Sequence, residues 1–178
     1  MKPLRPRYSK IERLVGDLLS QGNVRSPAVP IDKIAESCGI AIKIEDFNNE
    51  ISGLLLRTSH ATTIAVERRQ APTRQRFTIA HELGHFLLHE GEEVRIDKAF
   101  KLNFRSPASS KAEDIEEIEA NAFAASILMP AMMLEAEINE LDIDADDEEQ
   151  IRALADRYKV STQAMTIRLM NLFGFRPK

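Results

Sequence analysis

Residues 76–89 read RFTIAHELGHFLLH, and this stretch decides how the fold and the site are interpreted. His81 and His85 are four residues apart, so on a helix both imidazole rings lie on one face and can reach a single metal ion. Glu82 points to the flank of that face, where its carboxylate can hold a metal-bound water. This spacing predicts the site of a zinc hydrolase, with Glu82 as general base.

The faces of this helix support the prediction. At 100° per residue, one arc is polar and the opposite arc is apolar. The polar arc holds Thr78, His81, Glu82, His85 and His89, and the apolar arc holds Ile79, Leu83, Phe86 and Leu87. Gly84 lowers helix stability relative to alanine, so we expect another backbone or a substrate to approach closely there. We expect the helix to start near Thr73, which follows Pro72, and to stop at Gly91.

A catalytic zinc site needs a third protein ligand and an open fourth position. His89 lies eight residues after His81, about 12 Å along the helix axis, which is too far for both to bind one ion. We therefore interpret His89 as a residue that supports the ligands or caps the helix, or as a solvated side chain. Cys38 is isolated and expected in the core, and His60 lies in a turn-like stretch that is expected to be exposed.

The third ligand should then be a carboxylate from the alanine-rich segment 116–130, which is strongly helical and stopped by Pro130. Glu117 shares its helix face with small residues, Ala120 and Ala124, which would let this helix approach the histidine helix. Glu119 points about 200° away, so it cannot face the same ion. We favour Glu117 over Glu119 as ligand and expect Asn121, one turn from Glu117, to support the site.

Composition limits the class of protein. The 178 residues are 43% hydrophobic, enough for a proper core, and the net charge of −4 gives no general attraction to nucleic acid. A single cysteine excludes an internal disulfide and suits a reducing cytoplasm. No apolar segment resembles a secretory signal or a membrane span. The basic start, residues 1–7, is expected to be a disordered arm.

The remaining pattern predicts an α+β fold in which a small three-stranded sheet packs on helices. Helices are expected at 9–21 and 31–38, and strands at 40–44, 53–57 and 62–66. The strand at 62–66 is our candidate for an edge strand that holds a substrate backbone by strand addition. The turn-rich segment 92–111 is interpreted as a flap over the site. We expect a zinc metallopeptidase domain over residues 1–138 and a C-terminal helical segment over 139–178.

The C-terminal segment resembles a helix-turn-helix, in which Ser161 would cap the second helix. Before it, residues 142–149 carry six acidic side chains, interpreted as a solvated linker and a helix N-terminus rather than a calcium site. The second helix offers only Arg168 before Arg176 and Lys178. We therefore favour packing or partner docking over direct DNA binding.

The whole pattern resembles the ImmA/IrrE family of metallopeptidases. The matching residues are the sequence RFTIAHELGH at 76–85, Glu117, Ala120-Asn121, Phe123-Ala124-Ala125 and Leu128-Met129-Pro130, with VPIDKIA at 29–35, ISG at 51–53 and LADRYKVS at 154–161. The resemblance implies a gluzincin-like, cytoplasmic peptidase with His81, His85 and Glu117 as zinc ligands and Glu82 as catalytic base. It also implies that the substrates are helix-turn-helix repressors of phage, mobile-element or stress-response genes.

Three functional hypotheses follow. The first is a zinc endopeptidase that cleaves such a repressor, although manganese or iron could replace zinc at a two-histidine, one-carboxylate site. The second is a metal-binding regulatory module that inactivates a repressor without cleaving it. The third is a toxin–antitoxin component that acts on a partner encoded beside it. The presence of Glu82 favours the enzyme, because a protein that only binds needs no general base.

Overall fold

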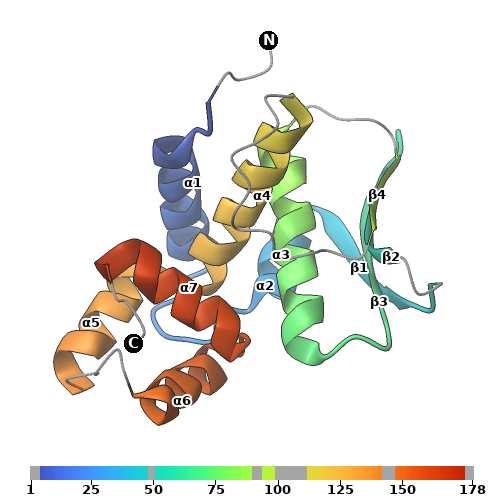
Figure 1. Ribbon diagram of the computed structural model, residues 1–178. Helices are drawn as coiled ribbons and strands as arrows, with labels where there is room; N and C mark the ends of the chain where they lie inside the picture. Colours follow the sequence, from blue (N-terminus) through green and yellow to red (C-terminus); the bar gives the residue numbers. More distant parts are fainter. Residues whose placement is uncertain (1–4, 48–50, 90–93, 99–111, 142–146, 175–178) are drawn as a thin grey trace.

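The computed structural model describes residues 5–47, 51–89, 94–98, 112–141 and 147–174. The helices in this part of the chain are α1 (Tyr8–Gln21), α2 (Ile31–Ser37), α3 (Pro72–Leu88), α4 (Ala112–Leu128), α5 (Ala131–Leu141), α6 (Glu148–Tyr158) and α7 (Thr162–Phe173). The strands are β1 (Ile40–Glu45), β2 (Ile51–Arg57), β3 (Thr62–Glu67) and β4 (Val94–Lys98). The α+β class is confirmed, with a helical pair at the C-terminal end (Figure 1).

The sheet has the order β1-β3-β2-β4. Strand β1 pairs with β3 in parallel, and β2 pairs in antiparallel fashion with both β3 and β4. The three predicted strands are present, but a fourth, β4, forms within the segment that we interpreted as a flap. The rest of that segment, residues 92–93 and 99–111, lies outside the described residues. The prediction that β3 is an edge strand is wrong, because it is paired on both sides.

Helix α3 lies between the sheet and α4 (Figure 1). It begins at Pro72, whose fixed φ and missing N–H suit the first helical position, and it ends before His89, whose backbone is extended. Both of its faces are therefore covered: Leu83 packs in the apolar core with Phe123 and Ile64, while the predicted polar arc is also buried. The polar side chains face neighbouring helices and strands instead of water.

Two glycines allow the elements around α3 to come close. A Cβ on Gly84 would lie 3.0 Å from Phe123 Cδ1 and 3.2 Å from the Cα of Ala120, so α4 packs directly on the glycine. A Cβ on Gly53 in β2 would collide with Thr78 and would lie 3.5 Å from Glu82 Oε1. The expected close approach at Gly84 is thus made by the backbone of α4.

The two C-terminal helices meet at a short turn. The side chain of Asp147 accepts from the backbone N–H of Glu149 and Gln150 at the start of α6. The hydroxyl of Ser161 accepts from Ala164 at 3.2 Å, so the predicted cap on α7 is present. Residues 142–146 of the acidic run lie outside the described residues. The division of the chain at residue 138 stays a prediction.

Arg168 does not lie on an exposed face of α7. Its side chain is buried, its Nε donates to the carbonyl of Met129 at 3.1 Å, and its Nη2 lies 3.9 Å from a carboxylate oxygen of Glu12. Burial lowers the pKa of this guanidinium, opposed by the charge of Glu12. The side chain ties α7 to the end of α4, so this arginine is unsuited to bind a phosphate backbone. None of the described helices is long and apolar enough to cross a membrane.

We predict that Gly84→Ala and Gly16→Ala change stability in opposite directions. Gly16 lies in α1, and a Cβ at this position would have no neighbour within 4 Å, so alanine there should raise the free energy of unfolding by about 0.5–1 kcal/mol. Alanine at position 84 meets the backbone of α4, and overpacking should lower stability by about 1 kcal/mol. Urea unfolding of both variants measures the difference. An equal gain in stability at both positions would show that α3 and α4 are not in close contact at Gly84.

We also predict that Arg168→Ala lowers the free energy of unfolding by about 2 kcal/mol, because a buried carbonyl loses a charged donor. The exposed Arg152, changed to alanine as a control, should shift stability by less than about 0.5 kcal/mol. Thermal melts test the role of Arg168 in packing, and a DNA mobility-shift assay tests whether Arg168 contacts DNA. A salt-sensitive shift that Arg168→Ala alone abolishes would contradict its assignment as a packing residue.

Candidate metal centre

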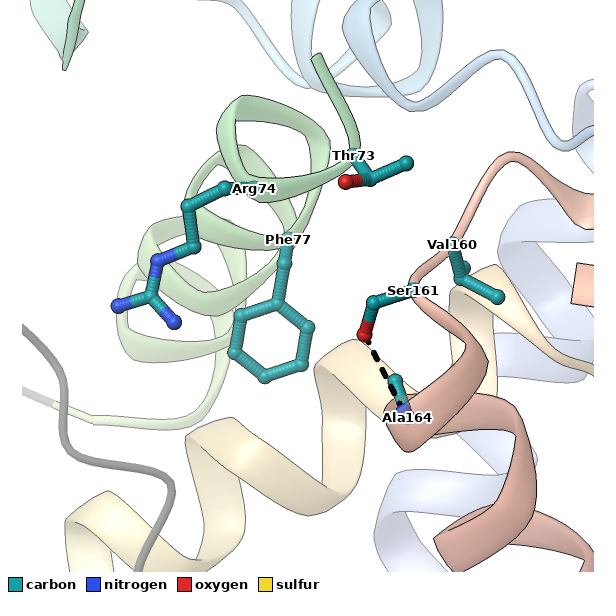
Figure 2. Close-up of a pocket in the computed structure, with 6 residues that line it drawn as sticks. All are labelled: Thr73, Arg74, Phe77, Val160, Ser161 and Ala164. Carbon is teal, nitrogen blue, oxygen red and sulfur yellow. Dashed lines mark hydrogen bonds between the residues drawn. The ribbon is translucent and has the colours of Figure 1, made fainter. Parts of the chain in front are cut away.

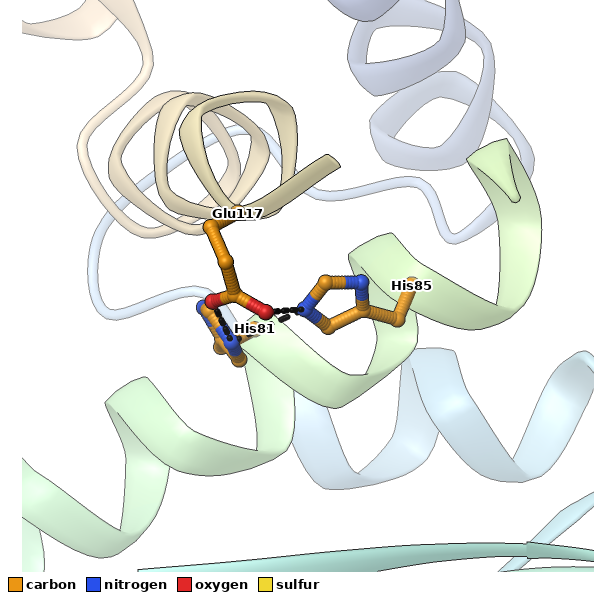
Figure 3. Close-up of side chains that lie close together, drawn as sticks. All are labelled: His81, His85 and Glu117. Carbon is orange, nitrogen blue, oxygen red and sulfur yellow. Dashed lines mark hydrogen bonds and ion pairs between the residues drawn. The ribbon is translucent and has the colours of Figure 1, made fainter. Parts of the chain in front are cut away.

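The two histidines of α3 face one glutamate of α4. His81 Nε2 lies 3.0 Å from His85 Nε2, and each of these atoms is 3.4 Å from an oxygen of Glu117. Figure 3 shows the Glu117 carboxylate pointing from α4 toward both rings. Among the described residues these three form a group whose ligand atoms all lie within 4.8 Å of one another.

This arrangement fits a divalent metal ion. Ligand atoms placed tetrahedrally around an ion at typical zinc distances are about 3.3 Å apart, close to the spacing of these three atoms. Both histidines are 1% exposed, so their ring nitrogens converge in a site largely shielded from water. Two imidazole nitrogens and one carboxylate suit zinc, manganese or iron.

Glu117 is held in the form that binds a cation. Burial raises its pKa, but hydrogen bonds and charge from His81 and His85 outweigh burial and hold the pKa of Glu117 far below its usual value. The carboxylate is therefore ionised at neutral pH. An anionic oxygen donor beside two histidine nitrogens is a donor set that a divalent ion can use.

The second nitrogen of each histidine ring is also held. His81 Nδ1 donates to Asn121 Oδ1 at 3.0 Å, and His85 Nδ1 lies 3.0 Å from His89 Nδ1. Such contacts fix the ring orientation and direct Nε2 toward the metal position. Asn121 and His89 thus lie where the sequence predicted supporting residues, and the alternative of a solvated His89 is wrong because the side chain is buried.

Glu119 points away from this cluster, as the helix faces predicted. It is fully buried, and its oxygens accept from Arg7 and from His89 Nε2, the latter at 2.9 Å. Burial raises the pKa of Glu119, but the hydrogen bonds lower it to about 2. The prediction of a disordered arm over residues 1–7 is wrong for Arg7. Residues 1–4 lie outside the described residues.

Glu82 lies beside the two histidines on α3 and is completely buried. Gly53 of β2 passes close to its carboxylate, and any side chain on Gly53 would enter that space. The missing side chain therefore shapes the surroundings of Glu82, a role that the motif at 51–53 did not reveal from sequence alone. The location of Glu82 suits a group that exchanges protons with a molecule bound at the histidines.

Two hollows lie beside Phe77, which is one turn before His81 on α3. Phe77 stacks on His81 with ring centroids 6.3 Å apart, and it lines both hollows. Figure 2 shows the smaller one, about 60 Å³, with Phe77 and Arg74 on α3 opposite Ser161 and Ala164 at the start of α7. The larger, about 520 Å³, lies between α1, α4 and α7 and includes Asn121 in its wall.

The other candidate residues lie away from the site. His60 is exposed in the turn between β2 and β3, as expected. Cys38 is partly buried and packs against the apolar core, also as expected, and burial raises the pKa of its thiol. Arg7 is the residue that sequence reasoning missed. The only signal in the sequence was that a buried Glu119 would need a cationic partner, and the sequence does not name that partner.

The chain belongs to the Peptidase_M78 family, described as the IrrE N-terminal-like domain, whose model matches residues 35–170. The comparison with curated proteins found no match. Among solved structures, a Mycobacterium tuberculosis transcriptional regulator superposes with a TM-score of 0.63 at 14% sequence identity. The match covers 95% of this chain and 48% of that protein, so the chain spans about half its length. At this identity the likeness concerns the fold alone.

We predict that Glu117→Ala removes a bound metal ion, whereas the ion is still found in Glu119→Ala. Glu117 supplies one of three converging ligand atoms, and Glu119 faces Arg7 instead. Elemental analysis of protein purified without chelator, together with metal titration, measures the difference. The exposed Glu135, changed to alanine, controls for loss of a negative charge and should leave metal content unchanged. The reverse ranking of Glu117 and Glu119 would refute the ligand set.

Proposed function

We propose that this protein is a zinc-dependent endopeptidase that cleaves a helix-turn-helix transcriptional repressor. The observation that carries the proposal is the convergence of His81, His85 and Glu117 next to the buried Glu82. Membership of a peptidase family supports hydrolysis of a peptide bond. In this proposal the three converging residues hold the ion and Glu82 is the catalytic base.

The chemistry divides between the ion and the protein. A bound zinc ion polarises a carbonyl group and lowers the pKa of a water molecule. Glu82 takes a proton from the attacking water and passes it to the nitrogen of the leaving amine. Asn121 and His89 keep the two imidazole rings in place throughout, because their contacts fix both Nδ1 atoms.

A polypeptide substrate would bind along strand β4. With β3 paired on both sides, β4 and β1 are the edges of the described sheet. Strand β4 pairs with β2 in the sheet. Strand β2 packs on α3 at Gly53, which lies beside Glu82. Val94 and Ile96 of β4 are 45% and 54% exposed. An extended segment could pair with the open side of this strand.

The proposed substrate is a repressor of transcription. The structural neighbour from Mycobacterium tuberculosis is a transcriptional regulator, which supports a link between this fold and gene regulation. The family resemblance points to a helix-turn-helix repressor of stress-response, phage or mobile-element genes. Because such a repressor acts in the cytoplasm, the proposal includes a cytoplasmic location for the peptidase.

We predict that Glu82→Gln keeps the metal ion and lowers the rate of repressor cleavage by about 10²–10⁴-fold, since the amide has the same shape but cannot act as a base. Zinc-loaded wild type and variant are incubated with candidate helix-turn-helix repressors, beginning with any that is encoded beside this gene, and fragments are identified by mass spectrometry. The exposed Glu36 provides a matched control, and Glu36→Gln should cleave like wild type.

The same experiment separates cleavage from sequestration. A peptidase requires that Glu82→Gln binds the repressor, leaves it intact and fails to derepress the target promoter. Full derepression by this variant without any repressor fragment would favour the binding module. Arrest of growth by the wild-type chain alone, relieved only by a partner encoded beside it, would favour the toxin–antitoxin alternative.

A further inference from the structure

Arg7 joins the N-terminal segment to the interior of the molecule. It precedes α1 and contacts Glu119 in α4, a residue 112 positions later. Its backbone N–H and its Nε donate to Glu119 Oε1 at 2.6 and 2.9 Å, and its Nη2 donates to Oε2 at 2.7 Å. Nη2 also donates to the carbonyl of Leu88 at 3.0 Å. One side chain thus holds a buried carboxylate and the last turn of α3.

The carboxylate that Arg7 holds is the start of a hydrogen-bonded chain. Glu119 is completely buried, and an unpaired carboxylate at such a position would be strongly unfavourable. The guanidinium supplies the opposite charge in a two-pronged geometry that suits a carboxylate. Glu119 therefore stays an acceptor without a proton. Its Oε2 accepts a hydrogen bond from Arg7 Nη2 and a second one from His89 Nε2.

The direction of each hydrogen bond then follows along the chain. Because Glu119 can only accept, the proton of a neutral His89 ring lies on Nε2, and its Nδ1 becomes an acceptor. His85 Nδ1, 3.0 Å away, must then donate to it. A neutral His85 with its proton on Nδ1 presents the lone pair of Nε2 to His81 and Glu117, where the metal position lies.

We propose that Arg7 is a positioning residue for the metal centre: through Glu119 and His89 it orients His85 and thereby sets how tightly the ion is held. This inference rests on the proposed function only in that the converging residues bind a metal. It assigns a role to the N-terminal segment in the site itself. If Arg7 had only a structural role, it would stabilise the fold without changing the affinity of the site for the ion.

The experiment compares zinc affinity in wild type, Arg7→Ala, Arg7→Lys and Arg5→Ala. Arg5 is exposed in the same segment and is the matched control. Apparent dissociation constants are measured by competition with a chromophoric chelator, after circular dichroism has shown a native fold. We expect Arg7→Ala to weaken zinc binding by about 10–100-fold, the range typical of lost supporting contacts, and Arg5→Ala to match wild type. Arg7→Lys keeps the charge but loses the two-pronged geometry, so it should fall between them.

Two further measurements test the route from Arg7 to His85. Cobalt substituted for zinc reports ligand geometry in its visible spectrum, and Arg7→Ala should shift that spectrum while Arg5→Ala should not. The double variant Arg7→Ala, Glu119→Gln should bind zinc no more weakly than the weaker single variant, because both changes interrupt one chain. Additive losses would show that Arg7 acts by another route and would overturn the proposal.

The remaining outcomes are also decisive. One such outcome is that Arg7→Ala lowers thermal stability and yet leaves the zinc affinity and the cobalt spectrum as in wild type. That result would show that Arg7 only stabilises the fold, and it would refute the proposal. If Arg7→Ala does not fold, the affinity of Arg7→Lys decides in the same way. A wild-type chain that binds no divalent ion would refute both this inference and the proposed peptidase. A chain that binds zinc through Arg7 but cleaves no repressor would uphold this inference while the proposed function fails.

Discussion

The close packing of α3 on α4 is the constraint on which the site depends. Gly84 has no side chain, so the backbone of α4 at Ala120 comes within contact distance of α3. At that spacing Glu117, one turn before Ala120 and Asn121, reaches both histidines. A larger residue at position 84 would push the helices apart and move the carboxylate away from the imidazoles. The glycine inside the histidine motif is therefore part of the geometry that brings three potential ligands together.

A second feature of the structure is the number of polar and charged side chains that are buried in its interior. His81, Glu82, His85 and Glu119 are all buried, although each would be more easily hydrated at the surface. Asn121 orients His81, and a separate chain of contacts connects His85 through His89 and Glu119 to Arg7. Such a network gives each ring one fixed orientation, which an apolar core could not do. The apolar core around Leu83 and Phe123 provides the stability that this polar interior does not.

What the sequence could predict depended on how local each feature is. His81, Glu82 and His85 lie within five residues, so helical spacing alone placed them, and the opposite directions of Glu117 and Glu119 followed from two residues on one helix. Strand order is a long-range property, so the sequence at 62–66 predicted a strand but not its interior position in the sheet. The contact of Arg7 with Glu119 spans most of the chain, and no local pattern marks it. The separation of residues 139–178 as a unit stays a prediction.

That separation of 112 residues between Arg7 and Glu119 also orders events during protein synthesis. At about 5–20 residues per second, a ribosome makes Arg7 roughly 6 to 22 s before Glu119. The histidines of α3 are made after Arg7 but before Glu117. During that interval they have no carboxylate partner from α4. A nascent chain at that stage carries two imidazoles with no third ligand and no ordered neighbour for His85. His81, His85 and Glu117 can thus come together only after α4 has been translated.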